Sequence, residues 1–259
     1  MQKAFDSHCH LYAKDFDSDR IEVIESAKKY LWGILLVSEN LESNRKINLL
    51  CKEYPNFLFP AFGVHPEYAH IIDKEQLKEE LKWIKKQKPV CIGEIGLDRF
   101  WIKKVLKPHQ QNRAWQSQIN LFECFITLAK ELKIPLNVHS RWATRDVLDI
   151  LDKYKPEKVI LHAFSGNLNE AKEAIGKGYF ISLGTNILYS EQKRDLVKHL
   201  NLTNLLLETD SPVLGPEKGE RNEPKNIVYV IKELSLLKKI AEEKIIEVTN
   251  ENVKRLFFD

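Results

Sequence analysis

The sequence predicts a single-domain α/β protein that spans residues 1–259 as a (β/α)8 TIM barrel. Eight short apolar runs return along the chain, and a segment with helical spacing follows each run. Runs such as residues 31–37 are apolar almost throughout, which is typical of parallel strands that are buried on both faces. Strict alternation of strand and helix implies a parallel sheet, and 259 residues is a normal length for an α/β barrel.

The eight expected strands follow the apolar runs in order, at 4–10, 31–37, 57–64, 90–97, 135–139, 158–162, 179–184 and 205–210. Helices are expected where apolar side chains recur every three or four residues, at 17–29, 44–51, 75–86, 109–132, 142–151, 168–175, 190–200, 225–239 and 242–256. Ser190 is a typical N-cap, and Gly176 and Gly178 are typical of a helix end. Residues 98–108 are expected to form a loop. A doubly wound open sheet is the alternative, but no Gly-x-Gly-x-x-Gly follows an early strand.

Composition narrows the class of protein. The chain carries 40 basic and 37 acidic residues, a net charge of +3, which neither requires nor excludes nucleic acid because a local patch would suffice. The four cysteines are scattered without a Cys-x-x-Cys pair, so we expect them to be reduced and mostly buried, in a cytoplasmic protein. No apolar run approaches the ~20 residues of a membrane helix, and we expect no membrane partner.

The first expected strand carries Phe5-Asp6-Ser7-His8-Cys9-His10. Side chains alternate across a strand, so His8 and His10 share one face. Two such imidazoles can bind one metal ion, although they could also be core histidines that only form hydrogen bonds.

The same kinds of side chain return at the ends of other strands. In a parallel barrel the strand ends converge on one rim, where active sites of this fold are built. Burying so many carboxylates and imidazoles without compensation would be costly, so we interpret the set as a metal centre. Its predicted members are His8, His10, Glu94, His139, His162 and Asp210, with His65 just past the third strand.

Six motifs, in order, resemble the TatD-type metal-dependent deoxyribonucleases of the amidohydrolase-like superfamily, and the resemblance spans essentially the whole chain. The motifs are Phe5-Asp6-Ser7-His8-Cys9-His10, Gly63-Val64-His65-Pro66, Gly93-Glu94-Ile95-Gly96-Leu97-Asp98, Asn137-Val138-His139-Ser140-Arg141, His162-Ala163-Phe164-Ser165-Gly166 and Glu208-Thr209-Asp210-Ser211-Pro212. The chain departs from the family at Ala163, often cysteine there, at Val213, usually aromatic, and in the aromatic stretch after Asp98.

The resemblance implies two divalent metal ions. His8, His10, Glu94 and Asp210 would hold one ion, and His139, His162 and the bridging Glu94 would hold the other. Two ions about 3.5–4 Å apart can activate water and stabilise both the attacking and the leaving oxygen of a phosphodiester. Asp210 would orient that water and accept its proton, and Glu208 would support the ligands. This nitrogen and oxygen donor set suits Mg²⁺, Mn²⁺ or Zn²⁺.

The predicted substrate contacts are His65, Arg141, Arg221 and Trp101. By resemblance His65 would touch a phosphate, although a structural hydrogen bond is an equal alternative. Arginine matches phosphate geometry with two donors, which favours a phosphate contact for Arg141; for Arg221 a loop salt bridge is the alternative. Trp101, beside lysines 103, 104 and 107, could stack on unpaired bases or pack on the barrel wall.

These features together predict a hydrolase that cleaves phosphodiester bonds of DNA. We expect an exonuclease that works at single-stranded or frayed ends, because a closed barrel mouth admits a strand end more easily than a duplex. An ester or amide hydrolase, for example an aminoacyl-tRNA deacylase, is the alternative on the same scaffold. Superfamily members of that kind often carry a carbamylated lysine on the fourth strand, where this chain has Glu94. A non-enzymatic binding protein is a third alternative. Such a protein would tolerate loss of Asp210 or of a metal-binding histidine, but none of these residues is missing here. The oligomeric state is open, and a monomer would fit.

Overall fold

Eight parallel strands form one barrel in a computed structural model that describes residues 2–258. The strands pair in sequence order, and a bridge between Cys9 and Ser211 brings the last segment against the first. Their bounds are β1 Ala4–Cys9, β2 Leu31–Val37, β3 Leu58–Phe62, β4 Cys91–Gly96, β5 Leu136–His139, β6 Val159–Leu161, β7 Phe180–Leu183 and β8 Leu205–Leu207. The predicted barrel is therefore confirmed.

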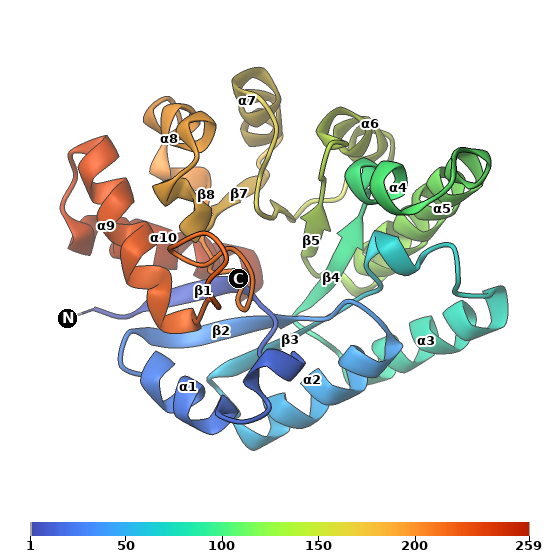
Figure 1. The fold of residues 1–259 in the computed structure, drawn as a ribbon, viewed down its shortest axis with the longest axis horizontal. Helices are drawn as coiled ribbons and strands as arrows, with labels where there is room; N and C mark the ends of the chain where they lie inside the picture. The colour runs from blue at the N-terminus through green and yellow to red at the C-terminus, as the bar shows by residue number, and fades with distance from the viewer. Residues whose placement is uncertain (1, 259) are drawn as a thin grey trace.

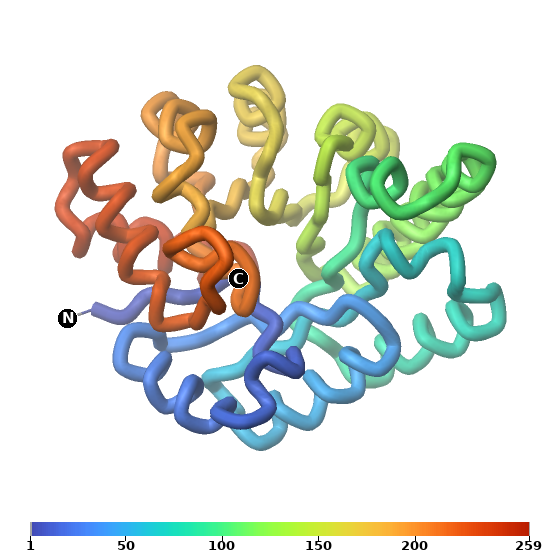
Figure 2. The backbone as a smooth tube through the Cα atoms, in the orientation of Figure 1, coloured from blue at the N-terminus to red at the C-terminus, as the bar shows by residue number. Residues whose placement is uncertain are grey.

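The helices surround the strands, as Figure 1 shows. They are α1 Arg20–Ala27, α2 Leu41–Glu53, α3 Lys74–Gln87, α4 Arg99–Val105, α5 Pro108–Leu132, α6 Thr144–Tyr154, α7 Leu168–Gly176, α8 Glu191–Lys198, α9 Ile227–Lys238 and α10 Glu242–Phe257. The tube in Figure 2 follows the chain once around the barrel, so the first and last segments lie side by side. None of the helices within residues 2–258 is long and apolar enough to cross a membrane.

The strands are buried because both of their faces are covered. Side chains such as Ile34 and Leu36 are fully buried in the main apolar core that the strands share with the helices. A second cluster, which includes Phe5 and Leu256, fills the amino-terminal end of the barrel, where the Asn250 amide donates to the Lys3 carbonyl at 2.8 Å. The opposite end, where the strands finish, is left for polar side chains.

Residues 99–105 form helix α4, where the sequence predicts a loop. Asp98 is its N-cap, because the Asp98 carboxylate accepts the backbone N–H of Trp101 at 2.7 Å. The helix has only seven residues, which is too short for a recurring apolar spacing to be recognised in the sequence. This helix places the aromatic and basic side chains after Asp98 on the rim of the barrel.

The four cysteines are free, as predicted. Cys9 and Cys91 are buried and Cys51 is half-buried, but Cys124 is exposed on α5. The expectation of mostly buried cysteines is therefore wrong for Cys124, which lies on the outer face of a long amphipathic helix.

Candidate metal centre

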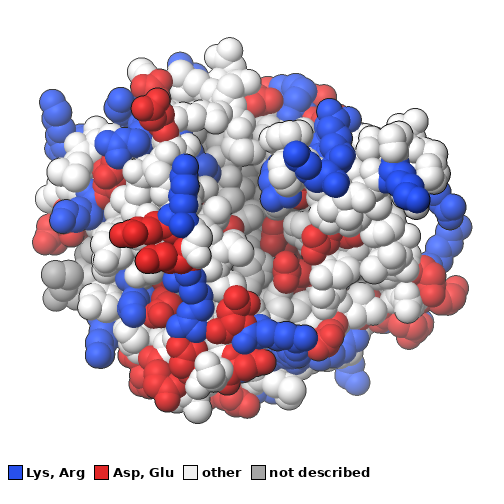
Figure 3. Space-filling view, viewed as in Figure 1, with Lys and Arg blue, Asp and Glu red and all other residues white. Residues whose placement is uncertain are grey.

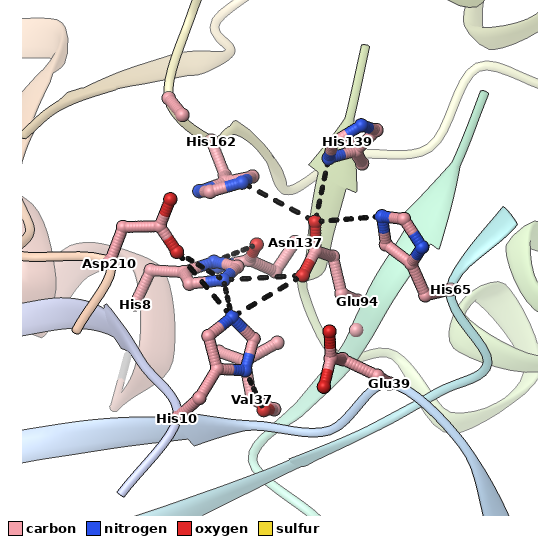
Figure 4. A network of polar contacts seen from close by, with 12 residues as sticks. His8, His10, Val37, Glu39, His65, Glu94, Asn137, His139, His162 and Asp210 are labelled. Atoms are coloured by element: carbon pink, nitrogen blue, oxygen red, sulfur yellow. Dashed lines mark hydrogen bonds and ion pairs between the residues drawn. The ribbon is translucent and has the colours of Figure 1, made fainter. Parts of the chain in front are cut away.

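The six predicted ligands lie together at the carboxyl ends of the strands. His8 is in β1, Glu94 in β4 and His139 ends β5. His10, His162 and Asp210 lie in the segments just beyond β1, β6 and β8. Figure 4 shows Glu94 at the centre of the group. All six side chains are buried except that of His139, which is 13% exposed.

The two oxygens of Glu94 face two different sets of side chains. Oε2 lies 3.3 Å from Nε2 of His8 and 3.7 Å from Nε2 of His10. Asp210 joins this side, with Oδ1 at 3.4 Å from Nε2 of His10. Oε1 lies 2.7 Å from Nδ1 of His139 and 3.3 Å from Nε2 of His162. One carboxylate therefore stands between a His8–His10–Asp210 set and a His139–His162 set.

The hydrogen bonds of His8 and His10 fix which ring nitrogen carries the proton. His10 Nδ1 lies 2.8 Å from the Val37 carbonyl, which can only accept, so Nδ1 must donate. His8 Nδ1 lies 2.9 Å from Oδ1 of Asn137, whose amide nitrogen donates to the Ser7 carbonyl. In their neutral forms both Nε2 atoms carry lone pairs, and these atoms face each other at 3.0 Å.

His139 and His162 are oriented in the same way. Nε2 of His139 lies 3.0 Å from Oδ2 of Asp98, and Nδ1 lies 2.7 Å from Oε1 of Glu94. When the ring is neutral and Nε2–H donates to Asp98, Nδ1 keeps a lone pair that a cation beside Glu94 could accept. Nδ1 of His162 lies 3.3 Å from Oε2 of Glu208, and Nε2 lies 3.3 Å from Oε1 of Glu94. When the ring is neutral and Nδ1–H donates to Glu208, Nε2 keeps its lone pair toward Glu94. Glu208 itself accepts from the Ala163 N–H at 2.8 Å and from the Ser182 hydroxyl.

Burial would lower the pKa of His10, but Asp210, Glu39 and Glu94 raise it to about 9, so the site attracts positive charge. With all four rings neutral, four lone pairs and two carboxylates would converge. Such a set repels itself unless a cation lies inside it. Metal-bound histidines nearly always donate their outer N–H to a carboxylate, a carbonyl or a similar acceptor, and each of the four rings has such an acceptor at its outer nitrogen here. The residues present therefore fit a divalent cation, and His8, His10 and Asp210 form one candidate group while Glu94, His139 and His162 form another.

The charge distribution agrees with this geometry. Burial alone would raise the pKa of Glu94, but the charge of His162 and the hydrogen bond from His139 hold that pKa well below its usual value. Burial would likewise raise the pKa of Asp210, but His162 and His10 lower it. Both carboxylates are therefore ionised at neutral pH and can act as metal ligands.

His65 also faces Glu94, but with the opposite ring orientation. Its Nδ1 accepts the backbone N–H of Glu67 at 3.3 Å, so Nε2 carries the proton and lies 3.5 Å from Oε1 of Glu94. Burial lowers the pKa of His65 to about 3, which keeps the ring neutral. His65 therefore presents an N–H donor to the site instead of a lone pair.

Of the other predicted substrate contacts, Arg141 lies nearest the centre. Its Nε is 3.3 Å from Oδ2 of Asp98, and its guanidinium stacks 3.9 Å over the Phe100 ring. Trp101 is half-buried and lies 5.1 Å from the His70 ring. These contacts leave both packing and stacking open for Trp101.

Arg221 is engaged elsewhere. Its guanidinium donates to both carboxylate oxygens of Asp19, at 2.9 and 2.6 Å, and to Glu223 at 3.1 Å. It also donates to the Asp15 carbonyl. These contacts favour the loop salt bridge over the predicted phosphate contact.

Several residues at the site were assigned no role from the sequence. Asp98 and Asn137 hold the outer nitrogens of His139 and His8. Glu39, two residues beyond β2, lies beside His10 and His65 in Figure 4 and accepts a hydrogen bond from the Tyr12 hydroxyl. Asp98 and Asn137 stand inside the sequence motifs, and polar residues next to strand-end ligands are the signal that could have found them.

The chain is similar to known proteins over nearly its whole length. The profile of the family described as TatD related DNase matches residues 5–258. The chain is 40% identical to the human protein named deoxyribonuclease TATDN3, over 97% of this chain and 93% of that one. It is 35% identical to the metal-dependent hydrolase MJ1582 of Methanocaldococcus jannaschii, over 98% of this chain and 97% of that one.

Solved structures that are similar to this chain include a TatD homologue. The crystal structure of YjjV, a TatD homologue from Escherichia coli, superposes with a TM-score of 0.86 at 27% identity, covering 98% of this chain and 97% of that one. A dihydroorotase from Campylobacter jejuni shares only the fold, with a TM-score of 0.62 at 13% identity, over 98% of this chain and 83% of that one. The chain belongs to the TatD-related DNase family.

Proposed function

We propose that this protein is a metal-dependent deoxyribonuclease that removes nucleotides from single-stranded or frayed DNA ends, with two divalent cations in its centre. The observation that carries the proposal is the position of Glu94 between two sets of imidazole nitrogens. A relative that is 40% identical and named a deoxyribonuclease supports DNA as the substrate.

When bound, two divalent cations would supply Lewis-acid stabilisation of a phosphodiester and a water molecule of lowered pKa. The protein would hold them through His8, His10 and Asp210 on one side of Glu94 and through His139 and His162 on the other. The donor set contains imidazole and carboxylate groups without thiolate, which suits Mg²⁺, Mn²⁺ or Zn²⁺.

Asp210 is the proposed proton acceptor. Its carboxylate is ionised, because His162 and His10 lower its pKa against the effect of burial. It lies beside the His8 and His10 nitrogens, at 3.7 and 3.4 Å, and so would stand next to the water that attacks phosphorus. A carboxylate in this position can orient that water and accept its proton.

His65 and Arg141 are the proposed phosphate contacts. The inward N–H of His65 is a donor that an anionic phosphate oxygen could accept. The Arg141 side chain is 45% exposed and shares one acceptor with His139 through Asp98, so a phosphate could reach its other donors. Both groups would bind the substrate without touching the cations.

The proposal is tested by digesting 5′- and 3′-end-labelled oligonucleotides, single-stranded and duplex, with Mg²⁺, Mn²⁺ or Zn²⁺. Asp210→Asn and Glu94→Gln are the matched variants, since each keeps the shape of the side chain and removes its charge. Stepwise shortening from one end, lost in both variants, is the expected result. Protein that holds two metals by elemental analysis but shortens no strand would refute the nuclease and move the search to ester and amide substrates.

A further inference from the structure

Trp142 is exposed on the rim of the barrel, in the turn between β5 and α6. It is 57% exposed, whereas the other four tryptophans, all within the described residues, are partly buried. Trp83 and Trp115 are covered by Arg45 and Arg99, at 3.6 and 3.9 Å. An exposed indole keeps its largest apolar surface in water, so packing does not explain its position.

Trp142 is part of a small aromatic surface. The Phe100 ring meets it edge to face, with ring centroids 4.9 Å apart, and the Arg141 guanidinium lies 3.9 Å from the Phe100 centroid. We call these three residues the rim ledge. Trp142 has a backbone φ of 57°, a left-handed conformation that is uncommon for a large side chain and is often retained at functional sites.

The rim ledge is connected to the metal centre by three consecutive contacts. Arg141 Nε lies 3.3 Å from Asp98 Oδ2, and the same oxygen accepts from His139 at 3.0 Å. His139 in turn lies 2.7 Å from Glu94. The rim ledge therefore lies beside the metal centre, within reach of a nucleotide next to a phosphate held there.

The charge around the rim ledge suits a polyanion. The Lys104 ammonium is 5.9 Å from the Phe100 centroid, and lysines 103 and 107 on the same segment are exposed. Figure 3 shows basic side chains on the rim and acidic side chains in the hollow at its centre. Cations beside exposed aromatic rings are the arrangement that holds unpaired bases in single-stranded nucleic acids.

We propose that the rim ledge stacks the base of a nucleotide next to the scissile phosphate, so that Trp142 is a substrate-binding residue for an unpaired strand. This inference rests on the proposed nuclease function. A duplex keeps its bases stacked on one another, so only an unpaired or frayed nucleotide can offer a base face to Trp142. Losing one base–aromatic stack corresponds to about a 5- to 150-fold weaker interaction with the strand.

The test measures KM and kcat for a labelled single-stranded 15-mer with Trp142→Ala, Trp142→Phe and Tyr30→Ala. Tyr30 is the matched control, because it is 41% exposed and directly precedes β2, on the opposite end of the barrel. Methyl p-nitrophenyl phosphate, a phosphodiester without a neighbouring nucleotide, reports the metal centre alone. Titration of the 15-mer into Asp210→Asn protein, followed by tryptophan emission, reports stacking without turnover.

The expected result is a 5- to 150-fold rise in KM for the 15-mer in Trp142→Ala, with kcat unchanged. Trp142→Phe should stay within about threefold of wild type, because it keeps an aromatic face. Added to the Asp210→Asn protein, Trp142→Phe should also lose most of the emission quenching that the strand causes. Tyr30→Ala should match wild type. Hydrolysis of the small phosphodiester should be equal in the wild type, Trp142→Ala, Trp142→Phe and Tyr30→Ala, which all keep Asp210.

Other outcomes separate the two proposals. If wild type digests the 15-mer and Trp142→Ala has the same KM, the rim ledge is refuted and the nuclease stands. If Trp142→Ala also loses activity on the small phosphodiester, Trp142 supports the fold of the site and the ledge is refuted. If Trp142→Ala changes only the sedimentation of the protein, the ledge is a contact between copies of this chain. If wild type hydrolyses neither compound with any cation, both proposals fall.

Discussion

Replacing Asp98 with asparagine tests the orientation of the histidine rings most directly. One Asp98 oxygen accepts the Trp101 N–H at 2.7 Å as the N-cap of α4, and the other accepts the Nε2–H of His139 at 3.0 Å. Asparagine is an equally good N-cap, so its single oxygen would stay on Trp101. Its NH₂ group would then face His139 and donate to Nε2, which moves the ring proton to Nδ1.

That proton would point at Glu94 and occupy the position of the ligand lone pair. Loss of a partner that orients a metal-bound histidine typically costs 10- to 100-fold in metal affinity, or about 1.4–2.7 kcal/mol. We expect the upper end, because asparagine imposes the wrong tautomer instead of merely releasing the ring. Asp98→Ala imposes no tautomer, so it should bind metal more tightly than Asp98→Asn yet lose about 1 kcal/mol of unfolding free energy with the cap.

The assay is a Zn²⁺ or Mn²⁺ titration in competition with a chromophoric chelator, which resolves the two expected affinities. Asp146→Asn is the control, because Asp146 pairs with Arg99 on the surface at 3.1 Å. In Asp98→Asn the affinity for the cation that His139 would bind should fall, and the affinity for the other cation should stay unchanged. Wild-type affinity in Asp98→Asn, or weaker binding in Asp98→Ala than in Asp98→Asn, would refute the assignment of tautomers.

Three further predictions concern the scaffold around the site. Gly96→Ala should lower the free energy of unfolding by more than about 3 kcal/mol and weaken metal binding, because a Cβ would lie 2.1 Å from the His139 carbonyl oxygen at a φ of 134°. Gly178→Ala is the control, because a Cβ there would meet nothing within 4 Å, and it should cost only about 1 kcal/mol. Chemical denaturation measures both values. Burial lowers the pKa of Lys193 to about 8. Between pH 8 and pH 10.5, the pKa of Lys193 in the unfolded chain, the unfolded chain binds more protons than the folded one. The free energy of unfolding of the wild type, relative to Lys193→Met, should therefore rise with pH over that window by on the order of 2–3 kcal/mol. Parallel curves of unfolding free energy against pH for the two proteins would contradict the burial of a charged amine. Arg221→Gln should lower stability by roughly 1 kcal/mol through loss of the partly exposed pair with Asp19 and leave KM for DNA unchanged, so a raised KM would restore a phosphate contact.

Most of the fold could be predicted because the strands are buried on both faces. Residues 31–37 are an apolar run with no helical period, and the structure makes them β2. Helix ends were harder, because a glycine signal is absent at several of them. Helices α3, α5, α6 and α9 end at lysines in the left-handed conformation, which the sequence does not distinguish from ordinary surface lysines.

The position of the centre followed from simple geometry, but its chemistry did not. Parallel strands must finish at one end of a barrel, so strand-end histidines and carboxylates were bound to meet. Which ring nitrogen faces inward depends on partners far away in the chain, such as Asn137 for His8 and Asp98 for His139. No local pattern encodes those pairings, because they form only when the barrel closes.

Arg141 and Arg221 show the same limit for substrate contacts. Both follow a strand that carries a predicted ligand, and the sequence gives them the same chemistry. In the structure Arg221 is neutralised by two carboxylates, and the pKa of Asp19 is lowered mainly by its hydrogen bond to Arg221. A phosphate would have to displace both carboxylates before it could use that guanidinium. Arg141 shares a single carboxylate with His139 and stacks on an aromatic ring, so it can bind a phosphate without breaking an ion pair of its own. Competition among neighbours, and not residue type, thus decides which arginine is available to an anionic substrate.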